Sequence, residues 1–470
     1  MKIISISING YKNIRNTHLD FSDNPIIVLL APNNYGKTNL LQGIQEAFGL
    51  IRKQGTEVVD YIRNRSYVDK FSSGKDILPF TFEVEFFKRT TEGCSDERLY
   101  HYKVVIDGSL TNSNDTKNIK GITTEFLEYT VYHRNKENQE IKKSSDSPIT
   151  LFERDLEDSS VAKFPCLPGN RCADIKHSSF DKDDKDDEDT RLYPAGWYLF
   201  LHKLGNMAII DGDKKNDTEL ADVLKEIAGV LTSLTRENIG LIIADEDSDY
   251  RSPVKLAREA QNLMLENEAE YRHFKESFCN MFPQYKEFEL VPVGNGRCEL
   301  LFKGQHTQED AMTLSYGTRR VFKLLSQICA NKTPLVCLEE LETGLHPSLY
   351  RNVLYAFFKS VDEELYKKRN TNTPNDKKRK NDPRLIITSH APVLVNRLDN
   401  DLNAVYIGVP SYCENGWASY KHLNEKGKKE IIEMIKKNEG KLGAGDIIFQ
   451  LFFDKFSKQT IEEAWLQDGS

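Results

Sequence analysis

The sequence lacks three features that would have pointed to particular classes of protein. No apolar run is long enough to cross a bilayer, and Met1-Lys2 leads directly into alternating residues, so we expect neither a membrane span nor a signal peptide. None of the eight cysteines forms a C-x-x-C pair, which argues against zinc and favours a reducing cytoplasm. Basic residues are fewer than acidic residues, and the net charge is −8. Any nucleic-acid contact must therefore come from a local patch.

The composition that remains is typical of a soluble globular protein. Apolar residues make up 39% of the chain and charged residues 29%, which is enough of each for a buried core and a polar surface. A chain of 470 residues is long enough for two or three domains.

The most informative motif is a loop between an apolar run, residues 25–30, and an amphipathic segment, residues 39–48. The loop is Ala31-Pro32-Asn33-Asn34-Tyr35-Gly36-Lys37-Thr38. A strand, a loop ending in Gly-Lys-Thr and a helix are the context of a phosphate-binding P-loop. The free N–H groups and the dipole of a helix N-terminus favour an anion at this place.

Each residue at the end of this loop has a chemical role in that prediction. Gly36 lets the backbone approach phosphates, Lys37 reaches the β- and γ-phosphates, and the hydroxyl of Thr38 holds Mg²⁺. Ala31 stands where the motif usually has its first glycine, and alanine disfavours positive φ. The alternative is an ordinary strand–turn–helix that contains Gly-Lys-Thr by chance.

The segments around the loop predict a mixed α/β architecture. Residues 80–87, 99–107 and 126–134 are rich in Phe, Tyr and Val and predict an antiparallel β layer. Residues 217–234 and 253–282 predict helices that form an inserted arm. Apolar spacing in the second predicts one packed face, which would consist of Leu256, Ala260, Leu263, Asn267, Tyr271 and Phe274.

Three motifs in the second half of the chain predict the rest of a site. Leu314-Ser315-Tyr316-Gly317 opens a helix, with Ser315 as a candidate N-cap. The buried strand 335–338 ends in Glu339 and Glu340; adjacent strand residues point to opposite faces, so one acid can serve Mg²⁺ and the other a water molecule. A third buried strand, 384–388, leads to Ser389 and His390.

Several charged or apolar segments have both a purely structural and a functional interpretation. The acidic run 181–189 predicts a solvated loop, with a Ca²⁺ loop as the alternative. Residues 367–380 are basic and predict a solvated loop, or a contact with nucleic acid or a partner. Asp245, Asp247 and Asp249 form a solvated loop or bind Mg²⁺. The apolar stretch 442–465 belongs to the core or docks a partner.

Taken together, the motifs resemble those of the ABC-type ATPases of the SMC/RecF/OLD group. Tyr11-Lys12-Asn13 resembles their N-terminal nucleotide-contacting element, and the Ser315 motif resembles their signature. The resemblance implies an α/β fold, an ABC-type P-loop NTPase core with an antiparallel β layer and an inserted helical arm. It suggests an N-lobe at 1–135, an insertion at 136–284, a C-lobe at 285–400 and an extension at 401–470.

By the same resemblance, two subunits bind two ATP molecules and Mg²⁺ head-to-tail. Glu340 and His390 would be catalytic, and Thr38 and Glu339 would bind Mg²⁺. ATP would contact Lys12, Asn13, Asn33, Asn34, Tyr35, Gly36, Lys37, Thr38, Asn39, Ser315 and Gly317. Ala31 in place of glycine and Glu339 in place of aspartate predict slow turnover, or ATP acting as a structural clamp.

The resemblance extends to ATPase subunits of bacterial anti-phage defence systems, such as AriA of PARIS and PtuA of Septu. It implies a higher oligomer of the chain, a separate nuclease effector and a phage-encoded trigger, with DNA contact optional and no membrane. Two alternatives stay open: a RecF-like DNA repair clamp, and an OLD-like nuclease. An OLD nuclease continues into a Toprim domain, which we do not recognise after His390.

Overall fold

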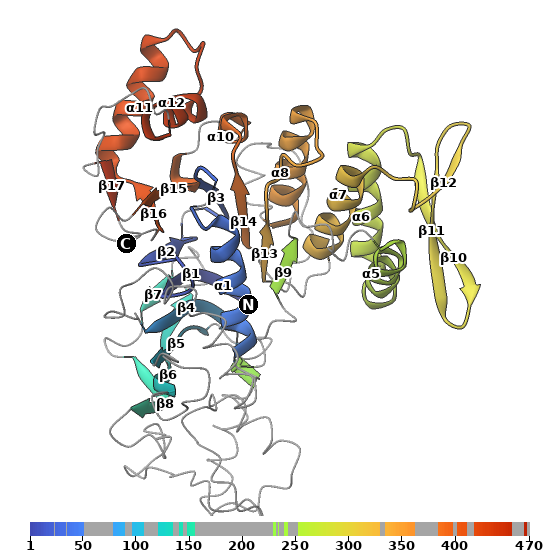
Figure 1. The fold of residues 1–470 in the computed structure, drawn as a ribbon. Helices are drawn as coiled ribbons and strands as arrows, with labels where there is room; N and C mark the ends of the chain where they lie inside the picture. Colours follow the sequence, from blue (N-terminus) through green and yellow to red (C-terminus); the bar gives the residue numbers. More distant parts are fainter. Residues whose placement is uncertain are drawn as a thin grey trace, which may run out of the picture. The chain divides into compact units, whose positions relative to one another are not determined.

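A computed structural model describes most of the chain as two compact units. The described residues are 1–22, 24–33, 35–50, 79–89, 96–107, 121–134, 141–143, 148–155, 229–231, 234, 239–242, 252–329, 334–361, 384–397, 402–410, 418–453 and 465–467. Unit 1 comprises Met1–Asp20, Gln42–Asn238 and Val409–Ser419; unit 2 comprises Phe21–Leu41, Ile239–Gly408 and Tyr420–Ser470. The main elements are labelled in Figure 1.

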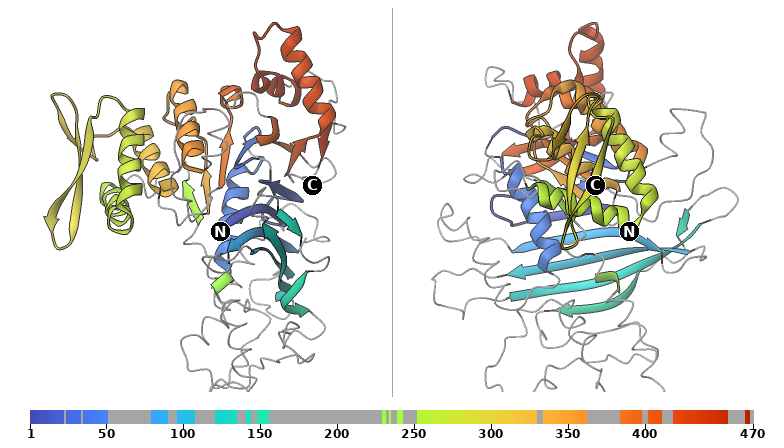
Figure 2. Two further views of the ribbon diagram at one scale, coloured as in Figure 1. Left: turned by 180° about the vertical axis from the view of Figure 1, so that it is seen from behind. Right: turned by 90° about the vertical axis from the view of Figure 1, so that its right-hand side faces the viewer.

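Unit 1 is built on an antiparallel sheet, which confirms the predicted β layer (Figure 2). Its strand order is β2-β1-β4-β5-β6-β7, and β8 also pairs with β6. The strands are β1 (Lys2–Asn9), β2 (Thr17–Asp20), β4 (Phe80–Arg89), β5 (Asp96–Asp107), β6 (Gly121–Arg134), β7 (Ile141–Lys143) and β8 (Ile149–Asp155).

The sheet of unit 1 has one apolar face because its strands alternate strictly. Phe82, Val84 and Phe86 of β4 are fully buried, whereas Glu83 and Glu85 between them are only partly buried. The second half of α1 (Lys37–Leu50) packs on the buried face, where the rings of Phe48 and Phe82 meet edge to face at 5.2 Å.

Unit 2 is built on a second, largely parallel sheet with the order β17-β16-β15-β3-β14-β13-β9. The strands are β3 (Ile26–Leu30), β9 (Ile239–Ile242), β13 (Leu335–Leu338), β14 (Arg384–Ser389), β15 (Val405–Pro410), β16 (Ala418–Leu423) and β17 (Leu466–Gln467). Every residue of β3, β13 and β14 is buried, as expected of parallel strands covered on both faces. This explains why each of these strands contains a continuous apolar run, at residues 26–30, 335–338 and 385–387.

Helices and short turns complete unit 2. They are α7 (Tyr316–Cys329), α8 (Pro347–Val361), α10 (Pro392–Arg397), the 3₁₀ turn η8 (Leu402–Ala404), α11 (Glu425–Lys437) and α12 (Ala444–Phe452). α7 is amphipathic and buries most of its length, including the polar residues Arg320 and Lys323. No helix among the described residues is long and apolar enough to cross a membrane.

The prediction of one continuous helix over residues 253–282 is wrong. The chain forms α5 (Pro253–Glu266) and α6 (Glu268–Met281), and Asn267 lies between them with φ −157° and ψ 94°. The Asn267 side chain accepts a hydrogen bond from the N–H of Glu270 at 3.3 Å, so it caps the second helix instead of continuing the first. Of the predicted face, Leu256, Ala260 and Leu263 are buried on α5, and Phe274 is buried on α6.

An aromatic cluster joins α6 and α7 to a small antiparallel sheet of β10 (Glu287–Gly294), β11 (Arg297–Lys303) and β12 (Gln308–Asp310). Phe322 of α7 lies with its ring centre 4.8 to 5.7 Å from those of Phe274, Phe278, Phe288 and Phe302. α5 is tied to the same helix by a contact between Glu259 and the buried Lys323.

Some predictions fall on parts of the chain outside the described residues. They concern most of the helix at 217–234, the acidic run 181–189, the basic run 367–380, and Asp245, Asp247 and Asp249. Those predictions stay as they are.

Candidate functional site

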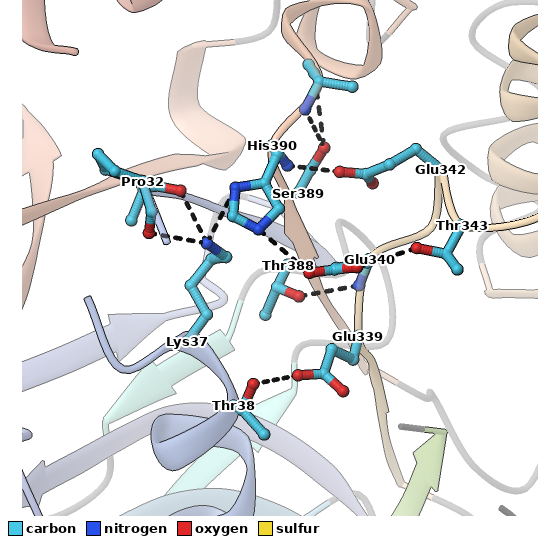
Figure 3. A network of polar contacts seen from close by, with 12 residues as sticks. Pro32, Lys37, Thr38, Glu339, Glu340, Glu342, Thr343, Thr388, Ser389 and His390 are labelled. Atoms are coloured by element: carbon cyan, nitrogen blue, oxygen red, sulfur yellow. Dashed lines mark hydrogen bonds and ion pairs between the residues drawn. The ribbon is translucent and has the colours of Figure 1, made fainter. Parts of the chain in front are cut away.

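The predicted site residues of unit 2 lie at the carboxyl ends of three adjacent parallel strands. β14 pairs in parallel with both β3 and β13, and Ser389 stands opposite Leu30. The residues after these strands therefore emerge at one edge of the sheet. Figure 3 shows Lys37, Glu340 and His390 converging there.

The loop after β3 curls around the ammonium group of Lys37. Lys37 is only 6% exposed, and its Nζ donates to the carbonyl oxygens of Ala31 at 2.7 Å and Pro32 at 3.1 Å. Gly36 has φ +78°, a conformation that favours glycine. Its carbonyl accepts a hydrogen bond from the N–H of Leu40 at 2.8 Å, which starts α1. The loop is thus a strand-to-helix turn whose carbonyl groups hold the ammonium group of Lys37.

Ala31, which departs from the P-loop pattern, fits without backbone strain. Its φ lies outside the left-handed region, so no glycine is needed at this position. The Ala31 methyl group has room because Gly408 lies opposite: a Cβ at Gly408 would be 2.6 Å from the Cβ of Ala31. The missing side chain of Gly408 in β15 therefore leaves the space that the methyl group of Ala31 occupies.

Burial lowers the pKa of Lys37 to about 8, because the charged form loses its hydration. The carboxylates of Glu340, Glu342 and Glu339 oppose this shift by favouring the ammonium ion. The ammonium of Lys37 therefore faces three carboxylates, and this excess of negative charge is suited to a divalent cation beside any bound phosphate.

Thr38 and Glu339, the two predicted Mg²⁺ ligands, are in direct contact. The hydroxyl of Thr38 donates to Oε1 of Glu339, and Glu339 is only 7% exposed. A hydroxyl and a carboxylate supply the oxygen ligands that Mg²⁺ prefers, and phosphates and water complete such sites. The pair therefore fits a magnesium ion held jointly with a nucleotide. Among the described residues, no three or more His, Cys, Asp or Glu side chains are grouped so that they could hold a metal ion by themselves.

Glu340 turns its side chain toward His390. Oε1 of Glu340 lies 3.1 Å from Nε2 of His390, and Oε2 accepts a hydrogen bond from the hydroxyl of Thr343 at 2.9 Å. Nδ1 of the same histidine lies 3.2 Å from Nζ of Lys37. Since an ammonium group only donates, Nδ1 is the acceptor and Nε2 carries the proton. Lys37, His390 and Glu340 thus form one continuous chain of hydrogen bonds.

The backbone around Glu340 is held in an unusual conformation. Glu340 has φ +46°, which few residues other than glycine adopt. Its N–H donates to the hydroxyl of the fully buried Thr388 at 2.9 Å. These contacts fix the direction in which the Glu340 carboxylate points.

Arg320, to which the sequence pattern assigns no role, supports the loop of residues 339–343 through hydrogen bonds to its backbone. It is 2% exposed, and its guanidinium donates to the carbonyl oxygens of Glu340 at 2.8 Å and Thr343 at 2.9 Å, and also to that of Glu339. The only available signal was a basic residue just before the apolar positions Val321 and Leu324 of a predicted helix. Such a residue is more often exposed.

Glu342 is a second residue that the sequence did not single out. Its Oε1 accepts the backbone N–H of His390, while Oε2 is buried with no hydrogen-bond partner among the described residues. It therefore holds the backbone of His390 from the Glu340 side of the site.

Ser315 and Gly317 have clear local roles at the start of α7. Ser315 Oγ accepts from the N–H of Thr318 at 3.2 Å and caps the helix. A Cβ at Gly317 would be 1.8 Å from the carbonyl oxygen of Gly344, so only glycine fits. These contacts lie within one chain, and a contact of either residue with ATP of a second chain stays a prediction.

Lys12 and Asn13 belong to unit 1. Nζ of Lys12 donates to Oε1 of Gln42 at 2.8 Å, and the Asn13 carbonyl accepts from Ala418 at 2.8 Å. Their contact with nucleotide stays a prediction.

The other predicted ATP contacts lie in the loop itself or at the start of α1. Asn33 is exposed, and Asn39 is in the first turn of α1. The Tyr35 carbonyl accepts from the hydroxyl of Tyr420 at 3.2 Å. Asn34 lies outside the described residues.

The parallel sheet and the loop that ends in Gly36-Lys37-Thr38 between β3 and α1 define a P-loop nucleotide-binding fold. A family model described as "AAA domain, putative AbiEii toxin, Type IV TA system" matches residues 26–396. This span covers most of the chain, and the chain belongs to that family.

Solved structures with similar folds include heads of SMC proteins. One is the SMC head bound to the C-winged helix domain of ScpA, with 11% identity, 91% of this chain and 99% of that chain covered, and a TM-score of 0.47. Another is the SMC head domain with an extended coiled coil, bound to the C-terminal domain of ScpA, from Pyrococcus furiosus. It is 12% identical, covers 93% of this chain and 99% of that chain, and has a TM-score of 0.41. The SMC head domain from Thermotoga maritima is 11% identical, covers 90% of this chain and 100% of that chain, and has a TM-score of 0.36. No curated protein matches the sequence.

Proposed function

We propose that the chain binds ATP with Mg²⁺ and hydrolyses it slowly. The observation that carries this proposal is the chain of hydrogen bonds from Lys37 through His390 to Glu340, at the edge where three parallel strands end. A cation, a proton donor and a carboxylate in this order match the groups that phosphoryl transfer to water requires.

Each residue has a defined task in the proposed reaction. The ammonium of Lys37 exchanges its bonds to Ala31 and Pro32 for phosphate oxygens. The Nε2–H of His390 is free to donate to the γ-phosphate once it leaves Glu340, and the released carboxylate orients the attacking water. Thr38 and Glu339 hold Mg²⁺, which neutralises charge on the phosphates. Glu339 is one methylene longer than the usual aspartate, which supports slow turnover.

We further propose a head-to-tail dimer in which Ser315 and Gly317 of one copy face the ATP bound to Lys37 of the other. Helix α7 begins beside these residues, and the positive end of a helix dipole favours an anion. The sequence ranges 1–135, 136–284, 285–400 and 401–470 would then act as N-lobe, insertion, C-lobe and extension.

In the cell, we propose that this dimer, within a larger cytoplasmic oligomer, is the ATPase subunit of an anti-phage complex that restrains a separate nuclease. The family description names a toxin of a type IV TA system, which supports a role in controlled toxicity. A phage-encoded protein would act as the trigger, and DNA contact is not required.

Nucleotide binding is tested by thermal unfolding of purified protein with and without Mg·ATP. Wild type is expected to gain several degrees, and Lys37→Ala none, because a ligand stabilises only the state that binds it. Lys426→Ala, which removes an exposed lysine of α11, should behave like wild type. An unchanged melting temperature of the wild type at millimolar ATP would refute binding.

The cellular role is tested by phage plaque counts in cells that express the chain with its neighbouring genes. Protection should be lost with Lys37→Ala and retained with Lys426→Ala. Salt-sensitive, ATP-dependent binding to DNA ends by the isolated chain would instead favour the repair clamp. Metal-dependent DNA cleavage by the isolated chain would favour the nuclease.

A further inference from the structure

The N-terminus of α12 is locked onto α10 by one asparagine and one aspartate. Nδ2 of Asn396 donates to Oδ2 of Asp446 at 2.8 Å, and Oδ1 of Asn396 accepts the N–H of Gly445 at 2.8 Å. Oδ2 of Asp446 also accepts the N–H of Gly443 at 3.0 Å. We call Asn396, Asp446, Gly443 and Gly445 the α10–α12 clamp.

The two glycines of the clamp allow a backbone approach that no other residue permits. A Cβ at Gly443 would lie 2.2 Å from Oδ1 of Asn396, and one at Gly445 would lie 2.0 Å from the carbonyl oxygen of Pro392. Both distances are far below van der Waals contact, so the backbone at Gly445 meets the backbone of Pro392 directly, and the backbone at Gly443 lies against the side chain of Asn396. Such a contact transmits displacement because close-packed groups cannot be compressed.

On its other side, the clamp is directly connected to His390. Pro392, whose carbonyl faces Gly445, starts α10 only two residues after His390. Ser389 Oγ accepts the N–H of Ala391 at 2.9 Å and fixes the bend between them. Leu394 and Val395 of α10 are fully buried, so this helix is anchored in the core.

Beyond the clamp, α12 is packed with α11 into a C-terminal helical pair (Figure 1). Ile448 of α12 and Ile431 of α11 are both fully buried. Gly427 of α11 packs closely on Trp465, since a Cβ there would lie 2.9 Å from the tryptophan carbonyl oxygen. A displacement of α12 is therefore shared by the pair.

We propose that Asn396 is a positioning residue that couples His390 to the C-terminal helical pair. The proposal rests on the proposed ATP site, because His390 must respond to the γ-phosphate. When His390 leaves Glu340 for the phosphate, α10 follows, and the clamp passes the change to α12 and α11. Coupling is reciprocal, so a partner that holds the helical pair changes ATP affinity by the same factor.

Hydrogen exchange of the full chain, with and without a non-hydrolysable Mg·ATP analogue, tests the coupling. In wild type, the analogue should slow exchange in the loop at 31–41 and, by about fivefold or more, in α12 at 444–452. Asn396→Asp places two carboxylates together, so the loop should remain protected while the effect on α12 is lost. Asn352→Asp, the same change at an exposed position of α8, should leave both effects intact.

The reciprocal double variant Asn396→Asp/Asp446→Asn separates coupling from folding. The carboxylate introduced at position 396 can accept from Gly445 and from the new amide at position 446, so both hydrogen bonds of position 396 can form again. Protection of α12 by the analogue should return. If it does not return in a double variant with wild-type stability, the proposal is overturned.

Two further outcomes distinguish this inference from the proposed function. Equal protection of α12 in wild type and in Asn396→Asp refutes the coupling and leaves ATP binding intact. Absence of protection in the loop of the wild type refutes ATP binding, and the coupling with it.

Discussion

Nζ of Lys37 and Nδ1 of His390 lie 3.2 Å apart, although 353 positions separate the two residues in the chain. The parallel pairing of β3 and β14 brings them together, since each residue follows the carboxyl end of its strand. The contact fixes the histidine tautomer and connects the ammonium group of Lys37, through His390, to the carboxylate of Glu340, which follows the next strand.

ATP affinity should fall as the pH rises above 8. The Lys37 pKa is lowered to about 8 by burial, so the free protein loses this cation between pH 8 and 9, while bound phosphates favour the charged form. Affinity should drop by up to about tenfold per pH unit above 8. Calorimetric titration at pH 7 and 9 measures this, and equal affinities would contradict it.

The same lowered pKa should affect stability without nucleotide. Because the unfolded chain binds the Lys37 proton up to about pH 10.4 and the folded chain only up to about 8, this residue's contribution to stability rises with pH between these values. Lys37→Met removes the titration, so the unfolding free energy of the wild type should rise relative to that of the variant across this window. Denaturation at pH 7 and 9.5 gives the comparison.

Arg320→Ala should lower the unfolding free energy by about 3 kcal/mol or more. The substitution leaves three carbonyl oxygens without their donor in a buried place. Arg297→Ala, at the exposed end of β11, should change it by less than about 0.5 kcal/mol. Urea denaturation of both variants is the measurement, and similar small losses would show that Arg320 does not support the loop.

Substitutions at Ser315 separate helix capping from ATP contact across a dimer. Ser315→Ala removes the cap and should cost about 1 kcal/mol, whereas aspartate also caps well, so Ser315→Asp should keep wild-type stability. The aspartate adds a negative charge where the proposed dimer brings the γ-phosphate, and ATP-dependent dimerisation should be lost. Light scattering with ATP measures this; a dimer that persists in Ser315→Asp would exclude the proposed geometry.

Glu340→Gln should stop ATP hydrolysis and stabilise the ATP-bound dimer. Glutamine can keep contacts with His390 and Thr343 but does not activate water as a carboxylate does. Phosphate release should fall by at least about 100-fold, with ATP binding retained. Glu433→Gln on the exposed side of α11 is the matched control, and hydrolysis that survives in Glu340→Gln would assign the reaction to another residue.

The fold was predictable where the sequence pattern is local. Residues 26–30, 335–338 and 385–387 are continuous apolar runs because parallel strands are buried on both faces, and each leads into a charged or hydroxyl group of the site. The break at Asn267 was missed because apolar spacing continues across it. Only the cap that its side chain forms reveals the joint.

The supporting residues of the site were not predictable, because they depend on distant parts of the chain. Arg320 is an ordinary arginine until α7 packs under the loop of Glu340. Asn396 and Asp446 are 50 positions apart, and neither belongs to a recognisable pattern. Roles assigned to Lys12, Asn13 and Ser315 depend on a nucleotide or a second copy, so they remain predictions.

The cluster around Phe322, with the Glu259–Lys323 contact, makes residues 252–310 inseparable from α7. Excising that segment to obtain a smaller protein would strip α7 of its apolar cover and leave Lys323 without its carboxylate. A chimera that exchanges this segment should therefore exchange α7 together with it.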